Sequence, residues 1–245
     1  MTNINTITKI GIIGRGNWGK KVIKVLKKNF TVEFIAGKEV NYNKLTKQID
    51  WVFVLTPNHT HYKICKFFLN SKINVFCEKP LTMTFEQSID LYKISKKNKV
   101  ILYVDDIEIF KNKKLNIKSS NFIIRKKNDL GNNYSLFERF CYHDIYLIYD
   151  YIKNKKLKKL KFVKSSDLNF ILYYEKNTFN FLYSIHSKEK VHKINNTNFL
   201  KFSGNPLEKM ISGIIKKKKN FENSKRSLFA LKLILKLKSE YKKIL

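Results

Sequence analysis

The stretch that most constrains this chain is Lys9 to Gly19, which reads KIGIIGRGNWG. A short apolar run precedes three glycines, Gly14, Gly16 and Gly19, in the spacing G-x-G-x-x-G. The residues that follow, KKVIKVLKK, place apolar side chains at helical spacing, so the pattern predicts a strand, a tight turn and a helix. Glycines at these positions allow the turn, the approach of a phosphate to the backbone and close packing of helix on strand. The stretch therefore predicts a dinucleotide pyrophosphate site at a helix start.

Apolar runs alternate with helical patterns along the first 105 residues. After the glycine stretch, strands are expected at 31–36, 50–55, 72–77 and 100–104, and helices at 41–48, 64–70 and 84–97. Five strands that alternate with helices predict a parallel, doubly wound sheet with right-handed crossovers. We expect residues 1–105 to form a dinucleotide-binding domain.

Polar residues follow two of these strands, where open α/β sheets bind ligands. Thr56 begins TPNHTHY after one strand, and Glu78-Lys79-Pro80 follows the next. Proline does not continue a central strand, so Glu78 and Lys79 are expected at a strand end. His59 and His61 have no third ligand nearby in the sequence, which favours packing or cofactor contact over a metal site.

The choice of cofactor depends on the residues after the second strand. Glu39 lies about 20 positions after the glycines, where a carboxylate holds the ribose hydroxyls of NAD. Lys38, beside it, would suit the 2′-phosphate of NADP. The sequence leaves NAD and NADP as alternatives.

The net charge of +31 has two interpretations. It would attract polyanions such as nucleic acid or an anionic membrane. However, arginine occurs at only four positions, and lysines are spread along the whole chain. Nucleic-acid readers rely on arginine forks, so we favour A/T-rich codon usage as the origin of the charge and expect neither a nucleic-acid nor a membrane partner.

The cysteines indicate a reducing compartment. They lie at Cys65, Cys77 and Cys141, widely spaced and odd in number, which implies neither a disulfide framework nor a zinc site. The first residues, MTNINTITK, lack the charge and apolar core of a signal peptide. No apolar run is long enough to span a membrane, and we expect a cytoplasmic protein.

The second half has strand patterns at 121–125, 159–164, 168–175 and 178–186, the last three forming a meander. Helices are expected at 142–151, from Asn205-Pro206, and from Ser224 to Tyr241. We expect residues 106–245 to form a second α/β domain for substrate binding and oligomerisation.

The segments GRGNWG, TPNHTHY and EKP, in this order and spacing, resemble the Gfo/Idh/MocA family of NAD(P)-dependent oxidoreductases. The resemblance implies a Rossmann domain followed by an α/β domain built on an open, mostly antiparallel sheet, here shortened. It implies that Lys79 is catalytic, that the Lys79–Pro80 peptide is cis, and that His143 of the pair His143-Asp144 faces the substrate. It also implies a homo-oligomer formed through the second sheet.

One position departs from the resemblance. Many members of the family carry an aspartate one helical turn before the histidine, where this chain has Arg139 and the neighbouring Glu138 is out of register. This difference keeps a second hypothesis open, a non-catalytic NAD(P)-binding sensor.

The leading hypothesis is hydride transfer between NAD or NADP and a secondary alcohol or ketone of a sugar, cyclitol or sugar derivative. Lys79 and His143 are the expected catalytic residues. The expected cofactor-binding residues are Gly14, Arg15, Gly16, Asn17, Trp18, Gly19, Lys38, Glu39, Thr56, Pro57, Asn58, His61, Glu78 and Lys79. No metal site is expected.

Overall fold

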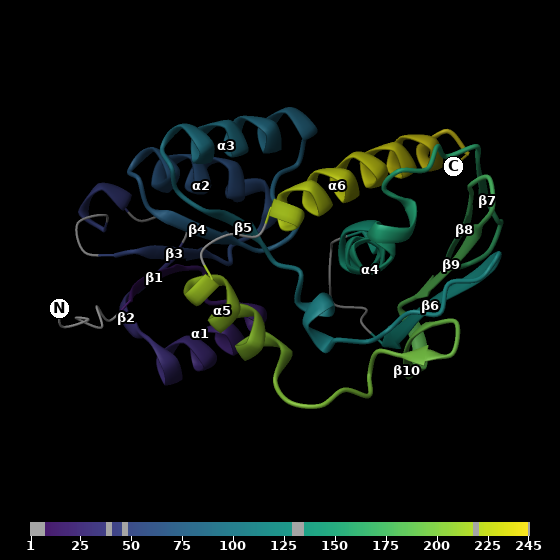
Figure 1. Ribbon diagram of the computed structural model, residues 1–245, viewed down its shortest axis with the longest axis horizontal. Coiled ribbons are helices and arrows are strands. Elements are labelled where there is room, and N and C mark those ends of the chain that lie inside the picture. The colour runs from purple at the N-terminus through teal and green to yellow at the C-terminus, as the bar shows by residue number, and fades with distance from the viewer. Residues whose placement is uncertain (1–7, 38–40, 46–48, 129–134, 218–220, 245) are drawn as a thin grey trace. The chain divides into compact units, whose positions relative to one another are not determined.

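The structure, a computed structural model, describes residues 8–37, 41–45, 49–128, 135–217 and 221–244. These residues form two compact units (Figure 1). The first comprises the described part of Met1–Asp105 together with Leu207–Leu228, and the second comprises Asp106–Pro206 and Phe229–Leu245.

The first unit holds a five-stranded parallel sheet with the order β2-β1-β3-β4-β5. Its strands are β1 (Lys9–Ile13), β2 (Thr31–Ala36), β3 (Trp51–Val54), β4 (Asn74–Cys77) and β5 (Leu102–Val104). Its helices are α1 (Asn17–Asn29), α2 (His61–Asn70) and α3 (Phe85–Lys97), with short turns η1 (Tyr42–Lys44) and η2 (Asn58–Thr60). The expected doubly wound parallel sheet is confirmed.

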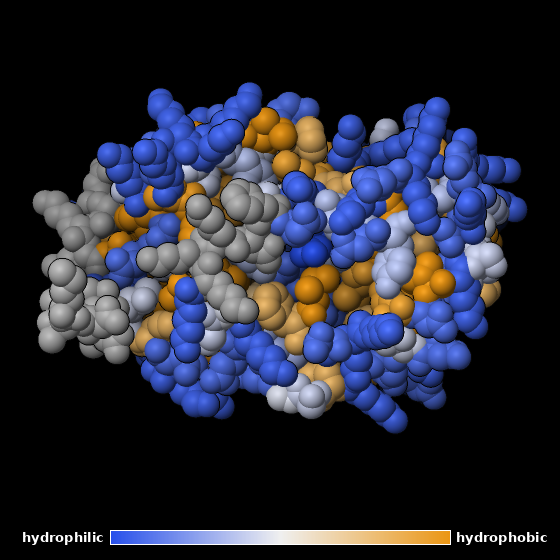
Figure 2. Space-filling view, in the orientation of Figure 1, coloured by the Kyte–Doolittle hydropathy of each residue, from blue (hydrophilic) through white to orange (hydrophobic). Residues whose placement is uncertain are grey.

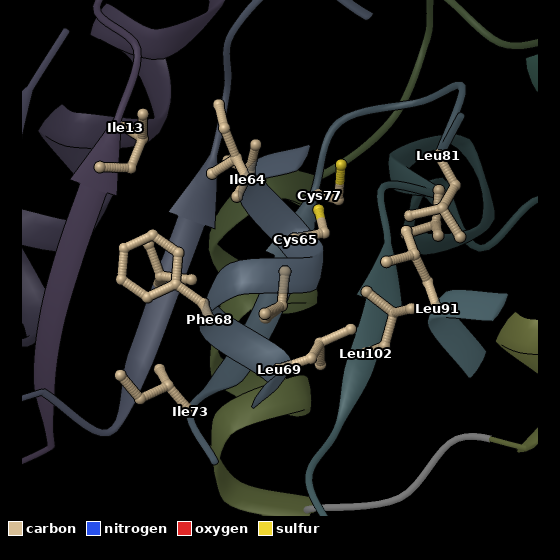
Figure 3. Packing of buried hydrophobic residues seen from close by; sticks show 14 residues of the cluster. Ile13, Ile64, Cys65, Phe68, Leu69, Ile73, Cys77, Leu81, Leu91 and Leu102 are labelled. Atoms are coloured by element: carbon tan, nitrogen blue, oxygen red, sulfur yellow. The ribbon is translucent and has the colours of Figure 1, made fainter. Parts of the chain in front are cut away.

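The central strands are apolar on both sides because helices cover both faces. All four residues of β3 are buried. Its Val52 and Val54 belong to a core under α2 and α3 that also holds Phe68 and Leu91 (Figure 3). The first helix, α1, buries Val22, Val25 and Leu26.

Two cysteines of this core lie side by side, as Figure 3 shows for Cys65 of α2 and Cys77 of β4. Both are fully buried, and burial raises the pKa of the Cys77 thiol well above its ordinary value. A buried, protonated thiol is unreactive. Cys77 is therefore a core residue, as its place in an apolar strand predicts.

The first compact unit also includes Leu207–Leu228, which lies inside the range expected for the second domain. This stretch includes most of α5 (Pro206–Lys217) and the start of α6 (Phe221–Lys242). Glu208 of α5 lies 3.6 Å from Lys28 of α1, oxygen to Nζ. The side chain of Asn223 accepts from the backbone N–H of Val104 and donates to its carbonyl, so it occupies the free edge of β5.

The second unit is built on a six-stranded sheet with the order β11-β10-β6-β9-β8-β7. Its strands are β6 (Ser120–Asn128), β7 (Lys159–Phe162), β8 (Leu168–Tyr173), β9 (Thr178–Ser184), β10 (His186–Ile194) and β11 (Thr197–Asn198). All neighbouring pairs are antiparallel except β6 and β9, which are parallel. The expected mostly antiparallel sheet is confirmed.

The prediction missed β10. The chain continues from β9 into this strand, which pairs with β6. Its sequence, HSKEKVHKI, shows no apolar alternation, and only His192 and Ile194 are buried in it. Strand assignment here depends on the partner β6 rather than on local propensity.

Two helices lie on one face of this sheet, α4 (Tyr142–Ile152) and the second half of α6 (Figure 1). Short turns precede α4: η3 (Ile107–Lys111) and the π-helix η4 (Phe137–Cys141). Aromatic rings fill the space between helices and sheet, and Phe170 of β8 stacks on Phe181 of β9 with centroids 4.5 Å apart. Within the described residues, no helix has the length and apolar character needed to cross a bilayer.

Candidate functional site

The site begins at the turn between β1 and α1. Gly14 has a φ of 105°, a backbone conformation that residues with a Cβ rarely adopt. A Cβ on Gly14 would also lie 2.6 Å from the backbone carbonyl of Leu55. The turn therefore requires glycine, and it brings the end of β1 against the residues that follow β3.

The start of α1 is open to a ligand. Gly16 precedes the helix in an extended conformation, and a Cβ built on it would meet no heavy atom within 4 Å. No side chain caps this helix end, and its first turn carries no acidic residue. A Cβ on Gly19 would lie 2.9 Å from the carbonyl oxygen of Gly14, so this glycine allows the helix to pack on the turn. Free N–H groups beside open space fit the pyrophosphate of a dinucleotide.

The neighbouring loops meet this turn at one edge of the sheet. Strand β1 lies between β2 and β3, so the chain order reverses there. Ligands of open α/β sheets bind beyond the carboxyl ends of the strands at such a point. The backbone N–H of Leu55 donates to Ile13, and that of Glu78 donates to Val54. The loops after β3 and β4 thus begin beside the glycine turn.

The loop after β3 is held by its own short polar side chains. The hydroxyl of Thr60 lies 2.6 Å from the hydroxyl of Thr56 and 2.7 Å from the carbonyl oxygen of Pro57. Thr56 and Asn58 are buried, whereas Pro57 is exposed. The loop therefore has a fixed backbone at the edge of the sheet.

His61 lies between the loops that follow β3 and β4. It is completely buried, and its ring nitrogens lie 2.8 Å from the carbonyl oxygens of Pro80 and Thr56. Burial lowers the pKa of His61, which favours the neutral ring, and its single N–H donates to one of these two carbonyls. His61 thus packs between the loops after β3 and β4, and direct contact with the cofactor stays a prediction. His59, two residues before it, is exposed.

Lys79 lies two residues after the end of β4, at the same edge of the sheet as the glycine turn. Glu78 and Lys79 are both partly buried, and the Lys79–Pro80 peptide bond is cis, as the resemblance implies. Because Asp105 donates its N–H to the carbonyl of Cys77, β5 supports this strand end from the other side. The first unit thus brings the glycine turn, the Thr56–His61 segment and Lys79 to one edge.

The structure describes some of the other expected cofactor-binding residues and leaves others out. Arg15 and Asn17 of the turn are exposed, and Trp18 is partly buried. Lys38 and Glu39, on which the choice of NAD or NADP was based, lie outside the described residues.

The second unit carries His143 in the first turn of α4, partly buried. Arg139 precedes it in the π-helix and is buried, with its guanidinium carbon 5.5 Å from the ring centre of Phe140. Glu138 forms an ion pair with Lys238, whose Nζ lies 2.7 Å from its carboxylate. Glu138 therefore does not replace the carboxylate that the family pattern leads one to expect.

Sequence reasoning missed a buried charged cluster next to His143. Asp144 is fully buried, with Oδ1 2.7 Å from Nε2 of His192 and 3.7 Å from a guanidinium nitrogen of Arg125. Glu108 pairs with Arg125 at 3.3 Å and with Lys111 at 2.7 Å. Burial alone would raise the pKa of Asp144, but His192 and Arg125 outweigh it and lower that pKa. The residues of this cluster come from four elements that are far apart in the sequence, so no local motif predicts the cluster.

No cluster of His, Cys, Asp and Glu suited to a metal ion occurs among the described residues.

Residues 24–106 match the model of a protein family described as an oxidoreductase family with an NAD-binding Rossmann fold, Gfo/Idh/MocA. Over these residues the chain is similar to the Gfo/Idh/MocA family. The match begins within α1, so the glycine turn is independent evidence for the same cofactor class, NAD or NADP.

Known proteins resemble the chain in part or in whole. An uncharacterized oxidoreductase of Bacillus subtilis, YfiI, is 41% identical over 54 residues, which cover 22% of this chain and 14% of that protein. The chain thus matches only about a seventh of the length of this relative.

Solved structures resemble the fold over almost its full length. UDP-N-acetylglucosamine 3-dehydrogenase from Acidithiobacillus ferrooxidans has a TM-score of 0.81 at 12% identity, covering 94% of this chain and 96% of that one. A myo-inositol dehydrogenase from Corynebacterium glutamicum has a TM-score of 0.72 at 12% identity, covering 93% and 94%. At such identities the likeness concerns the fold. The likeness extends over 96% of the first structure. The second unit of this chain keeps a six-stranded sheet, although we expected a shortened second domain.

Proposed function

We propose that this chain is an NAD(P)-dependent oxidoreductase that transfers a hydride between the nicotinamide and a secondary alcohol or ketone. The observation that carries the proposal is the edge of the first sheet. There an uncapped helix start faces open space at Gly16, and Lys79 lies two residues after the end of β4. A phosphate site and an amine at the same sheet edge suit a dinucleotide and a proton transfer beside it.

The chain supplies binding, orientation and proton transfer. The bound cofactor supplies the hydride chemistry. The backbone from Gly14 to Gly19 holds the pyrophosphate, and the neutral amine of Lys79 accepts the proton of the substrate hydroxyl as the hydride leaves carbon. In the reverse direction, the ammonium of Lys79 returns a proton to the carbonyl oxygen. His143 is proposed to orient the substrate or relay this proton.

A sugar, cyclitol or sugar derivative is the proposed substrate class. Two proteins with this fold are named for dehydrogenation of a nucleotide sugar and of an inositol. Because fold alone does not fix substrate, this part of the proposal rests on analogy. The free, buried thiols of all three cysteines agree with the proposed cytoplasmic location.

A test uses the full chain with NAD(H) or NADP(H) and a panel of polyols, sugars and nucleotide sugars, with absorbance at 340 nm as the readout. Turnover of a panel member that disappears in Lys79→Ala supports the proposal. Dinucleotide binding without turnover across the panel would instead support a sensor. The observation that favours the sensor is Arg139, a buried cation one turn before His143.

We also propose that a second copy of the chain covers the outer face of the second sheet. Phe122 of β6 is 55% exposed on this face, with the partly buried Ile124 of β6, Leu182 of β9 and Ile171 of β8 on neighbouring positions. Large exposed apolar side chains on a sheet face mark an interface. Light scattering should give a dimer or larger assembly, and Phe122→Glu should shift it toward the monomer. A monomeric wild-type chain would contradict this proposal.

Nucleic acid is not among the proposed partners. Figure 2 shows hydrophilic residues spread over the visible face rather than gathered in a single patch. Lysines spread along the chain give solubility and non-specific attraction rather than recognition.

A further inference from the structure

Four largely buried side chains of the second unit form a closed ring of alternating acids and bases. Nε2 of His192 lies 2.7 Å from Oδ1 of Asp144, which lies 3.7 Å from Nη1 of Arg125. Nη2 of the same guanidinium lies 3.3 Å from Oε1 of Glu108, whose Oε2 lies 3.7 Å from Nδ1 of His192. Outside the ring, Nζ of Lys111 lies 2.7 Å from Oε2 of Glu108. Each carboxylate of the ring therefore lies between two bases.

This ring fastens η3 and α4 to one face of the second sheet. Its two bases, Arg125 of β6 and His192 of β10, are direct partners in the antiparallel register, so their side chains leave the sheet on the same face. Its two acids come from η3, which supplies Glu108, and from the first turn of α4, which supplies Asp144. The Asp144 side chain is 0% exposed, and that of His192 is 2% exposed. The start of α4 is thus joined to the sheet by charged groups shielded from water.

Stability alone does not explain such a ring. Taking two charges out of water costs about as much as their attraction returns, so apolar side chains of similar volume would serve stability equally well. A charged pair differs from an apolar contact because its hydrogen bonds fix both distance and direction. Burial opposes the ionisation of Asp144, yet His192 and Arg125 lower its pKa, so the carboxylate is ionised and held between them. The ring therefore specifies one position for this carboxylate.

The position of Asp144 also sets the direction of His143. The two residues are consecutive in the first turn of α4, and successive helical residues are rotated by about 100° around the helix axis. The segment before them, Phe137–Cys141, is a π-helix, and no side chain caps the start of α4. The regular helical pattern is thus interrupted where His143 stands, and the anchored carboxylate beside it fixes the rotation of this turn.

We propose that Asp144, held by His192 and Arg125, is a positioning residue for His143. The proposal rests on the proposed function, in which His143 orients the substrate or relays a proton. The ring residues hold the helix turn in one orientation and take no part in the proton transfer itself.

The test follows the ring signals of the five histidines by NMR, on the full chain labelled at histidine, with the His143 signal assigned from His143→Gln. In the wild type, His143 should give a single sharp signal. His192→Ala removes the donor that holds Asp144, so the His143 signal should broaden or split. The signals of His59 and His61, in the first unit, should stay in place, which a general loss of structure would not allow.

A conservative variant and a control separate positioning from packing. His192→Gln keeps a side-chain N–H that can donate to Asp144, so it should restore the single His143 signal. His186→Ala removes an exposed histidine from the start of the same strand and should leave the His143 signal unchanged. Should His192→Ala fail to fold, Arg125→Lys keeps the charge without the fork that reaches both carboxylates, and it should broaden or split the same signal.

Kinetics give a second readout, with NADH or NADPH and any polyol, sugar or nucleotide sugar that the chain turns over. Misplacing a reacting group by about 1 Å costs on the order of 10²-fold, so His192→Ala should lower kcat by about 10- to 10²-fold. Affinity for the dinucleotide should stay unchanged, and His192→Gln should recover most of the lost rate.

The failures are distinguishable. A folded His192→Ala chain with the wild-type His143 signal overturns the proposal, and so does a change in that signal that His192→Gln does not reverse. A chain that binds neither NADH nor NADPH contradicts the proposed function instead. The NMR comparison needs no cofactor or substrate, so it still decides whether Asp144 fixes the direction of His143.

Discussion

Nε2 of His192 lies 2.7 Å from Oδ1 of Asp144, and the two side chains are 2% and 0% exposed. One comes from β10 and the other from the first turn of α4, 48 positions earlier. Asp144 directly follows His143, and the preceding π-helix interrupts the regular α-helical backbone pattern there. This pair therefore ties the start of α4 to the sheet and fixes the turn that carries His143.

Asp144→Asn should make the stability of the chain less sensitive to acid. Because the pKa of Asp144 is lowered from its ordinary value of 3.8, the ionised carboxylate stabilises the fold. This contribution is complete above pH 4 to 5 and is lost as the pH falls through the lowered value. Urea unfolding between pH 6 and pH 2 should show a flatter decline in the variant.

The size of the effect is also testable. Removing one partner of a buried ion pair costs about 3–5 kcal/mol, so Asp144→Ala should lower the free energy of unfolding at pH 7 by that order. Asp150→Ala, which removes an exposed carboxylate paired with Lys153, should cost less than about 1 kcal/mol. Equal effects of the two substitutions would mean that the buried cluster is not coupled.

His61→Ala should destabilise the first unit, because it leaves one of the two buried carbonyls, of Thr56 or Pro80, without its N–H donor. An unsatisfied buried polar group costs about 1–3 kcal/mol. The lowered pKa of His61 also means that its protonation opposes folding. In the wild type, this residue makes stability fall as the pH drops below about 6.5, the ordinary value for histidine.

Urea unfolding from pH 7 to pH 5 should therefore show a smaller slope in His61→Gln than in the wild type. The exposed His59 provides the control, since His59→Gln should leave the slope nearly unchanged. If both variants keep the wild-type slope, His61 is not the group that responds to pH.

Gly16→Val should abolish dinucleotide binding without unfolding the chain. The backbone at Gly16 is extended, with φ −65° and ψ −174°, and its Cβ position is open, so valine fits the apo fold. Its side chain would instead occupy the space proposed for the pyrophosphate. Calorimetry with NADH and NADPH measures the loss, and circular dichroism checks the fold. Wild-type affinity in this variant would remove the site from the glycine turn.

Lys79→Ala should slow the chemical step by about 10²–10⁴-fold in kcat, the range for a positioned acid or base. Affinity for the dinucleotide should change much less, because the pyrophosphate binds at the glycine turn. His143→Ala should cost less if the histidine only orients or relays. Stopped-flow hydride transfer separates the two effects, and a Lys79→Ala enzyme with the wild-type rate would contradict the assignment.

Much of the first unit follows from local pattern. The glycine spacing predicted the turn at Gly14, and apolar runs such as Trp51–Val54 predicted buried strands, because a parallel sheet covered on both faces requires continuous hydrophobicity. The motif around Lys79 likewise placed that residue at a strand end. Each of these features depends on a few residues that are neighbours in the sequence, so it can be predicted from the sequence alone.

The structure of the second unit is harder to predict from local sequence patterns. The lysine-rich β10 carries no alternation, and its pairing with β6 depends on residues about 65 positions apart, such as His192 and Arg125. The role of His61 was equally hidden, since its two carbonyl partners lie in different loops.

The sequence by itself determined the glycine turn, the doubly wound sheet and the candidate lysine, because each is specified by residues close together in the chain. Tertiary structure decided which polar side chains are buried against one another: His61 between two loops, Asp144 beside His192, and Leu207–Leu228 with the first unit. Burial and charge pairing depend on distances in space between distant segments, and these arise only when the chain has folded.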